Sequence, residues 1–119
     1  MLGFRSEKSA KIYEQHLSSI DLANDCPHCQ REAIKSFEHW KIIKSNFPYD
    51  RIAKEHLLLV TLEHKKTSEL SDAELAELHK IKQTEIPEHI THIIDVLPKR
   101  QSVPNHTHIH LIQQIDFVD

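Results

Sequence analysis

The stretch PNHTHIHLI, residues 104–112, places a histidine at every second position, at His106, His108 and His110. Successive side chains of a β-strand point to opposite faces, so the three imidazoles of such a strand share one face and the intervening, mostly apolar residues share the other. A solvated edge strand explains two such histidines, but Thr, Lys or Glu would serve a wet face equally well. Three histidines on one face of a strand instead favour a site in which imidazole groups bind a metal ion or act on phosphate.

The chain of 119 residues has the length of one domain, which we take to span residues 1–119. It contains no apolar run approaching the roughly 20 residues that a membrane span needs, and no basic, apolar leader at Met1. We therefore expect a cytoplasmic protein without a membrane partner. A formal net charge of −3 argues against binding of long nucleic acids, and a single glycine leaves little room for a Gly-rich phosphate loop.

Hydrophobic patterning predicts an α+β fold, a small antiparallel sheet with a short N-terminal helix and a longer helix packed across it. Apolar residues at helical spacing place the first helix at about residues 7–20. The second helix begins after Ser71, which forms a capping-box pattern with Glu74. Pro87 kinks this helix or begins a second segment, and the helical pattern ends by Pro98. The predicted strands cover residues 37–46, 55–64 and 105–117.

The only two cysteines, Cys26 and Cys29, stand in the motif CPHC. Their spacing lets two thiolates share one tetrahedral metal ion, and a zinc site of the Cys2His2 type needs two further histidines. A reduced pair in a turn without metal is the alternative. A redox pair is disfavoured, because the preceding SSIDLAND is not a convincing strand. We expect His28, inside the motif, to be a surface residue rather than a ligand.

The remaining histidines lack a comparable motif. We expect His79, His89 and His92 to face solvent from helical stretches. We expect His56, which opens the apolar strand, to be structural. Trp40 is expected to lie in the core rather than to stack on a base, because it stands close to apolar residues.

The segment QSVPNHTHIHLI resembles the signature of the histidine triad family of nucleotide hydrolases and transferases. In that family His-x-His-x-His-x-x, with x apolar, closes a strand and often follows Gly-Gln-Ser-Val. NFPYD followed by HLLLVTLEH is similar to the family's strand pair, and SELSDAELAEL to the helix that follows. The resemblance covers about residues 26–112. It implies the same α+β fold, a homodimer, and a small nucleotide as substrate.

Carried over by position, the resemblance implies that His108 attacks the α-phosphorus of a nucleotide and forms a nucleotidyl-histidine intermediate, which water then hydrolyses. His110 matches the residue that contacts the phosphate and assists the leaving group. The family's substrate-binding positions correspond to Asn46, Gln101 and Ser102. The implied substrates are nucleoside phosphoramidates or dinucleoside polyphosphates.

Some members of this family bind zinc. In them, a cysteine pair is completed by the histidine that ends the apolar strand and by the first histidine of the triad, which map here to His64 and His106. The resemblance thus implies a structural zinc ion held by Cys26, Cys29, His64 and His106. It leaves His108 and His110 free for chemistry.

Two alternatives remain open at this point. Arg100 stands where the family usually has glycine, and Pro104 and Asn105 occupy what is usually one residue before the triad. These departures suit a zinc-stabilised nucleotide-binding or interaction module without turnover. The other alternative is a purely metal-binding protein that uses all three triad histidines.

Overall fold

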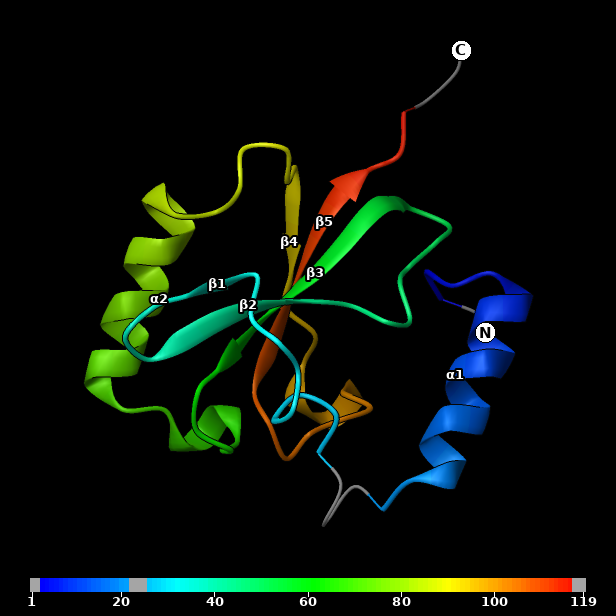
Figure 1. Ribbon diagram of the computed structural model, residues 1–119, viewed down its shortest axis with the longest axis horizontal. Coiled ribbons are helices and arrows are strands. Elements are labelled where there is room, and N and C mark those ends of the chain that lie inside the picture. The colour runs from blue at the N-terminus through cyan, green and yellow to red at the C-terminus, as the bar shows by residue number, and fades with distance from the viewer. Residues whose placement is uncertain (1–2, 22–25, 117–119) are drawn as a thin grey trace.

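The computed structural model describes residues 3–21 and 26–116, which form two α-helices and a five-stranded antiparallel sheet. The predicted α+β class is confirmed. The elements are α1 (Glu7–Ser19), β1 (Lys35–Ser36), β2 (Trp40–Lys44), β3 (Ala53–Thr61), α2 (Asp72–Thr84), β4 (His92–Ile94) and β5 (His108–Gln114), with short 3-10 helices at Thr67–Glu69 and Pro98–Arg100. The strand order is β1-β2-β3-β5-β4 (Figure 1).

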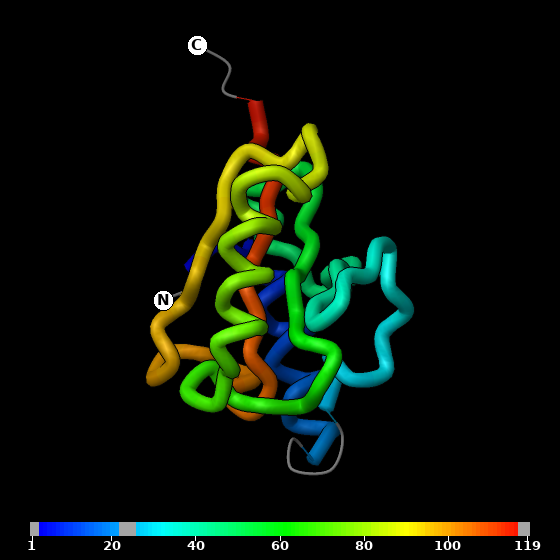
Figure 2. Tube along the Cα trace, turned by 90° about the vertical axis from the view of Figure 1, so that its left-hand side faces the viewer, coloured from blue at the N-terminus to red at the C-terminus, as the bar shows by residue number. Residues whose placement is uncertain are grey.

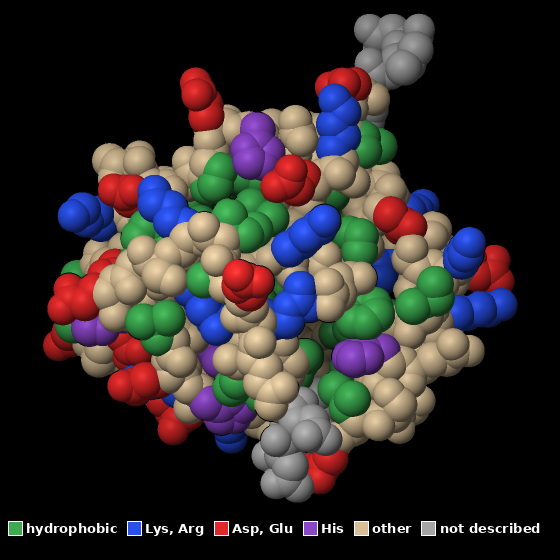
Figure 3. Space-filling view, in the orientation of Figure 1, with side chains coloured by type: hydrophobic (Ala, Val, Ile, Leu, Met, Phe, Trp, Pro, Cys, Tyr) green, Lys and Arg blue, Asp and Glu red, His purple; other side chains and the backbone are tan. Residues whose placement is uncertain are grey.

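The two helices lie on opposite sides of the sheet (Figure 1), and in the view from the α2 side α1 lies behind the strands (Figure 2). Each helix has 13 residues, so the second is no longer than the first. None of the described helices is long and apolar enough to cross a membrane. Carboxylates gather over α2, at the left of Figure 3.

The prediction that the second helix reaches Pro98 was wrong. The helix ends at Thr84, ahead of Pro87, and residues 92–94 form the edge strand β4. This strand pairs with β5, and the Thr91 N–H donates to the Ile112 carbonyl oxygen at 2.9 Å. Proline lacks an N–H and disfavours helical backbone in the residue before it, so the chain turns there. His89 and His92 therefore lie in a turn and on this edge strand rather than in a helix.

Strand pairing fixes which face the triad occupies. In the register of β3 and β5, His108 lies opposite Val60 and His110 opposite Leu58, so these side chains share one face of the sheet. The other face forms the core against α2, and its buried members are Trp40, Ile42, Leu57, Leu59, Ile81, Ile109 and Leu111. The side chains of His108 and His110 in β5 thus point away from the α2 core.

The predicted last strand extended to Phe117, which lies outside the described residues.

Trp40 belongs to this core, as predicted, and is fully buried. Its Nε1–H donates to the backbone carbonyl oxygen of Glu74 at 2.9 Å, which ties β2 to α2. The Glu74 side chain is itself buried. Its carboxylate accepts from the Ser71 N–H and from Lys65 Nζ, each at 2.8 Å, while the Ser71 hydroxyl accepts from the Glu74 N–H. The predicted capping box is present and starts α2.

The first helix is held to the loop between β2 and β3 by Asp50. Ser6 caps α1 by accepting from the Ser9 N–H, and the Asp50 carboxylate accepts from the Ser6 N–H at 2.6 Å and from the Ser6 hydroxyl at 2.8 Å. The Ser9 hydroxyl also donates to this carboxylate. These bonds place α1 across the imidazole-bearing face of the sheet.

Candidate active site and metal centre

The four predicted metal ligands come together at one point. One ligand atom from each of Cys26, Cys29, His64 and His106 lies within 4.8 Å of all the others. Cys26 Sγ is 3.3 Å from His106 Nδ1, and Cys29 Sγ is 3.2 Å from His64 Nδ1 and 3.4 Å from His106 Nδ1. The cluster could therefore hold a metal ion.

The chemistry of the donor set suits a tetrahedral ion. His106 is fully buried, and its Nε2–H donates to the Thr61 carbonyl oxygen at 2.8 Å, so the lone pair is on Nδ1, which faces the thiols. Zinc–sulfur and zinc–nitrogen bonds of ordinary length place adjacent sulfur and nitrogen ligands about 3.5 Å apart, close to the separations found here. Neither His108 nor His110 is part of this cluster.

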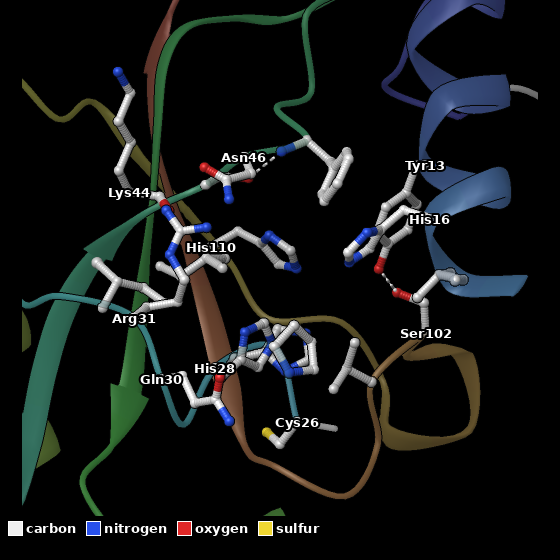
Figure 4. Close-up of a pocket in the computed structure, with 18 of the residues that line it drawn as sticks. Tyr13, His16, Cys26, His28, Gln30, Arg31, Lys44, Asn46, Ser102 and His110 are labelled. Carbon is white, nitrogen blue, oxygen red and sulfur yellow. Dashed lines mark hydrogen bonds between the residues drawn. The ribbon is translucent and has the colours of Figure 1, made fainter. Parts of the chain in front are cut away.

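A cavity of about 340 Å³ lies beside the cluster, on the sheet face that carries His108 and His110. Asn46 and Ser102 also line it, so the structure brings these two predicted substrate-binding residues to the two predicted catalytic histidines. Figure 4 shows Tyr13 and His16 of α1 facing His110 from one side, with Ser102 next to Tyr13. The Ser102 and Tyr13 hydroxyls share a hydrogen bond, which joins the segment before the triad to α1.

Gln101, the third predicted substrate-binding residue, does not line this cavity. Its side-chain amide donates to the Val96 carbonyl oxygen at 3.1 Å, and the residue borders a separate hollow. Gln101 follows the short 3-10 helix Pro98–Arg100, and the backbone bond from its N–H to the Pro98 carbonyl oxygen turns the chain at this point. Adjacent residues therefore face different spaces, and only Ser102 faces the histidines.

The cavity carries positive charge. The side chains of Arg5 and Arg31 line it, whereas the Lys44 side chain points away from it (Figure 4), and no carboxylate lines it among the described residues. Arg5 is held in place because its Nε–H donates to the Phe47 carbonyl oxygen at 2.9 Å and its guanidinium lies over the Tyr13 ring at 4.0 Å. Arg31 donates to the Lys44 carbonyl oxygen at 2.9 Å. Positive charges in a partly enclosed space attract phosphate strongly.

One ring nitrogen of His108 is hydrogen-bonded, and the other has no hydrogen-bond partner among the described residues. The His108 Nδ1–H donates to the His106 carbonyl oxygen at 2.9 Å, so the lone pair of the neutral ring is on Nε2. The side chain is buried but lines the cavity. Burial lowers the pKa of His108, more than its hydrogen bond to His106 and the charge of Asp95 raise it. A neutral imidazole with a free Nε2 is the form that can act as a nucleophile.

His110 is held by a closed chain of hydrogen bonds. The Tyr49 N–H donates to His56 Nδ1 at 3.0 Å, so the ring proton of neutral His56 is on Nε2, which lies 2.8 Å from His110 Nδ1. His110 then carries its proton on Nε2, which lies 3.1 Å from Tyr49 Oη. Burial lowers the pKa of both histidines, to about 4 for His56. His110 is thus presented as a neutral N–H donor.

His56 is therefore a site-supporting residue whose partners the sequence did not indicate. Its position at the head of an apolar strand suggested only a structural role. The tie to His110 depends on how β3 pairs with β5, where His56 lies opposite Ile112, two residues beyond His110. That register is a property of the folded sheet.

The expectation that His28 is a surface residue was wrong. Its side chain is only 7% exposed, and its ring centroid lies 4.7 Å from that of His108. The loop between the two cysteines folds inward when both thiols approach His106, and this brings the intervening histidine under the triad. The sequence pattern of the triad did not indicate that His28 lies beside His108, because the two residues are about 80 positions apart in the sequence.

Comparison with models of known protein families finds no match, and comparison with curated proteins finds none either.

Proposed function

We propose that this protein is a histidine triad enzyme that hydrolyses or transfers nucleotides at the α-phosphate, acting on nucleoside phosphoramidates or dinucleoside polyphosphates. The observation that carries this proposal is the orientation of His108. Its Nδ1–H is bound to the His106 carbonyl, and its Nε2, without a partner among the described residues, lies beside a cavity lined by the Arg5 and Arg31 side chains. A neutral nucleophile at the wall of an anion site is what attack on phosphorus requires.

The reaction proceeds in two displacements. His108 Nε2 forms a bond to the α-phosphorus while the bond from phosphorus to the leaving group breaks. A leaving nitrogen takes up a proton from water in the cavity, which the water that attacks in the second step returns, and a polyphosphate oxygen leaves as its anion. Water then attacks the same phosphorus, the nitrogen–phosphorus bond breaks, and the nucleoside monophosphate leaves with His108 neutral again. Transfer differs only in that another acceptor replaces water.

The surrounding side chains have distinct roles in this proposal. In this proposal the His110 Nε2–H exchanges its bond to Tyr49 Oη for one to a phosphoryl oxygen when substrate binds. With Arg5 and Arg31 it then stabilises the developing charge. Ser102 binds phosphate. In this proposal Asn46, which lines the cavity from the loop after β2, contacts the nucleoside. The cavity volume of about 340 Å³ is within the usual range for small-molecule sites.

The proposed cofactor is one structural zinc ion on Cys26, Cys29, His64 and His106. When bound, it would join the CPHC loop to the end of β3 and to the start of the triad. The His106 backbone carbonyl would thereby be fixed, and this is the group that orients His108. Zinc takes no part in the chemical step of this proposal.

We further propose that the protein is a cytoplasmic homodimer. The edge strand β4 supports dimer formation, since one of its sides is unpaired among the described strands, it carries the exposed Ile93, and the exposed Leu97 follows it. Light scattering coupled to gel filtration tests this, with a mass near twice 13.9 kDa expected.

The decisive experiment is release of AMP from adenosine phosphoramidate and from a dinucleoside tetraphosphate, by wild-type protein and His108→Ala in parallel. The proposal requires saturable turnover that the substitution abolishes. AMP binding without turnover by folded, zinc-loaded protein would instead establish the binding module. Zinc binding by the triad itself, lost from His108→Ala, would establish the purely metal-binding protein.

A further inference from the structure

His28 is a buried polar side chain with an unused ring nitrogen. It is 7% exposed, and its Nε2 atom has no hydrogen-bond partner among the described residues. Buried polar atoms in folded proteins are nearly always paired, so this nitrogen calls for a partner that the described residues do not supply. The metal cluster does not supply it, since that cluster consists of Cys26, Cys29, His64 and His106.

The position of His28 indicates where such a partner binds. The residue lines the same cavity as His108 and His110, and its ring centroid is 4.7 Å from that of His108. Figure 4 shows it below His110, on the side of the cavity where Cys26 and Gln30 lie. A molecule that reaches His108 Nε2 therefore passes close to His28.

The charge of the cavity indicates the chemistry of that partner. The Arg5 and Arg31 side chains line it without a carboxylate among the described lining residues, so the preferred ligand is an anion. An imidazole N–H donates readily to a phosphoryl oxygen. Arg31 belongs to the segment that follows CPHC, so this loop contributes both a formal charge and a hydrogen-bond donor to the same space.

We propose, on the basis of the function proposed above, that His28 is a phosphate-binding residue and that the CPHC loop couples metal binding to nucleotide binding. Cys26 and Cys29 flank His28, so an ion that holds both thiols against His64 and His106 also fixes the backbone between them. Loss of the ion removes that restraint, and the donor is then no longer pre-positioned for phosphate. The coupling is reciprocal, so bound phosphate also strengthens retention of the metal.

The first test is calorimetric titration of the zinc-loaded protein with AMP and with adenosine, which differ in the phosphate alone. In His28→Leu, AMP affinity should fall about ten- to hundredfold, as expected for loss of a hydrogen bond to a charged group, while adenosine affinity changes little. His28→Gln keeps an N–H donor and should recover part of the loss. His79→Leu, on the exposed surface of α2, is the matched control and should bind like wild type.

The second test measures the coupling without activity. Zinc is withdrawn from the protein by a competing chelator, with saturating AMP, with saturating adenosine, or without ligand. AMP should raise zinc retention by wild type about tenfold more than adenosine does. This difference should vanish in His28→Leu, whose zinc content before chelation and melting temperature serve as checks on its folding.

The outcomes separate this inference from the proposed function. Unchanged AMP affinity in folded, zinc-loaded His28→Leu, with wild-type AMP release intact, would overturn the role of His28 and leave the enzyme in place. Equal losses for AMP and adenosine would show that His28 only packs against His108, and would also overturn it. A wild-type protein that neither binds AMP nor releases it would refute both proposals.

Discussion

The Nδ1 atom of His108 lies 2.9 Å from the backbone carbonyl oxygen of His106. This contact joins the two sites, because His106 Nδ1 faces the cysteines while its carbonyl orients the ring of the next triad histidine. The residue that completes the metal cluster thereby sets the tautomer of the proposed nucleophile. The consequences of this contact can be tested separately at the metal cluster and at the cavity.

His108→Ala should lower kcat/KM for AMP release by about a thousandfold or more, because the group that forms the covalent intermediate is lost. The fold should persist, since this face of β5 borders a cavity rather than the α2 core. Steady-state kinetics and a thermal melt measure the two effects. Turnover within tenfold of wild type, in protein of verified sequence and zinc content, would contradict the assignment.

The purified protein should contain one zinc ion per chain. Cys29→Ser should reduce the zinc content and lower the melting temperature, because an ion that binds only the folded cluster stabilises the native state. His110→Asn is the control, since His110 lies outside the cluster. Elemental analysis and calorimetry provide the measurements. Equal zinc content in wild type and Cys29→Ser would refute the proposed ligand set.

Stability should fall as pH decreases below about 6.5 because of buried histidines such as His56. Burial lowers the pKa of folded His56 from 6.5 to about 4, so below pH 6.5 the unfolded chain binds this proton while the folded chain does not. The contribution of His56 to the free energy of unfolding is complete above 6.5, its pKa in the unfolded chain, and is lost as pH falls toward about 4. Between pH 8 and pH 5 the loss is roughly 2 kcal/mol.

Urea unfolding of wild type and His56→Gln at both pH values measures this contribution. The variant should be less stable at pH 8, because it lacks the bond to His110, but should lose less stability on acidification. An identical pH dependence in the two proteins would contradict the prediction. His92→Gln, at an exposed histidine of the edge strand, should follow the wild type.

Glu74→Ala should destabilise the protein by about 2–3 kcal/mol, because it removes a helix cap and leaves Lys65 without its buried partner. The carboxylate accepts from both the Ser71 N–H and Lys65 Nζ at 2.8 Å. Chemical denaturation measures the change. Asp72→Ala, in the same helical turn but exposed, is the comparison, and a loss equal to that of Glu74→Ala would argue against this account.

Asp50→Ala should weaken AMP binding more than it weakens the fold. Asp50 holds the start of α1 through Ser6 and Ser9, and α1 supplies one wall of the cavity without contributing a buried residue to the core. We expect a several-fold loss of AMP affinity with a small change in melting temperature. Unchanged affinity would show that α1 keeps its place through other contacts, such as that between Tyr13 and Ser102.

Periodicity and capping are local properties, so residue patterns alone predicted the α+β class, the helix at Glu7–Ser19, the start of α2 and the strands β2, β3 and β5. The resemblance to the histidine triad family implied that Cys26, Cys29, His64 and His106 belong together. The short strands β1 and β4 depend on packing in the folded chain, since two or three residues carry no periodic signal and pair only because a neighbouring strand is present.

The tertiary structure likewise decided which polar residues share the cavity. The burial of His28, the bond from His56 to His110 and the divergence of Gln101 from Ser102 each depend on packing between segments distant in sequence. A residue pattern fixes the type of side chain and its face on one element. The register of strands and the path of loops fix its neighbours, and these neighbours determine whether a histidine is a ligand, a nucleophile or a donor to phosphate.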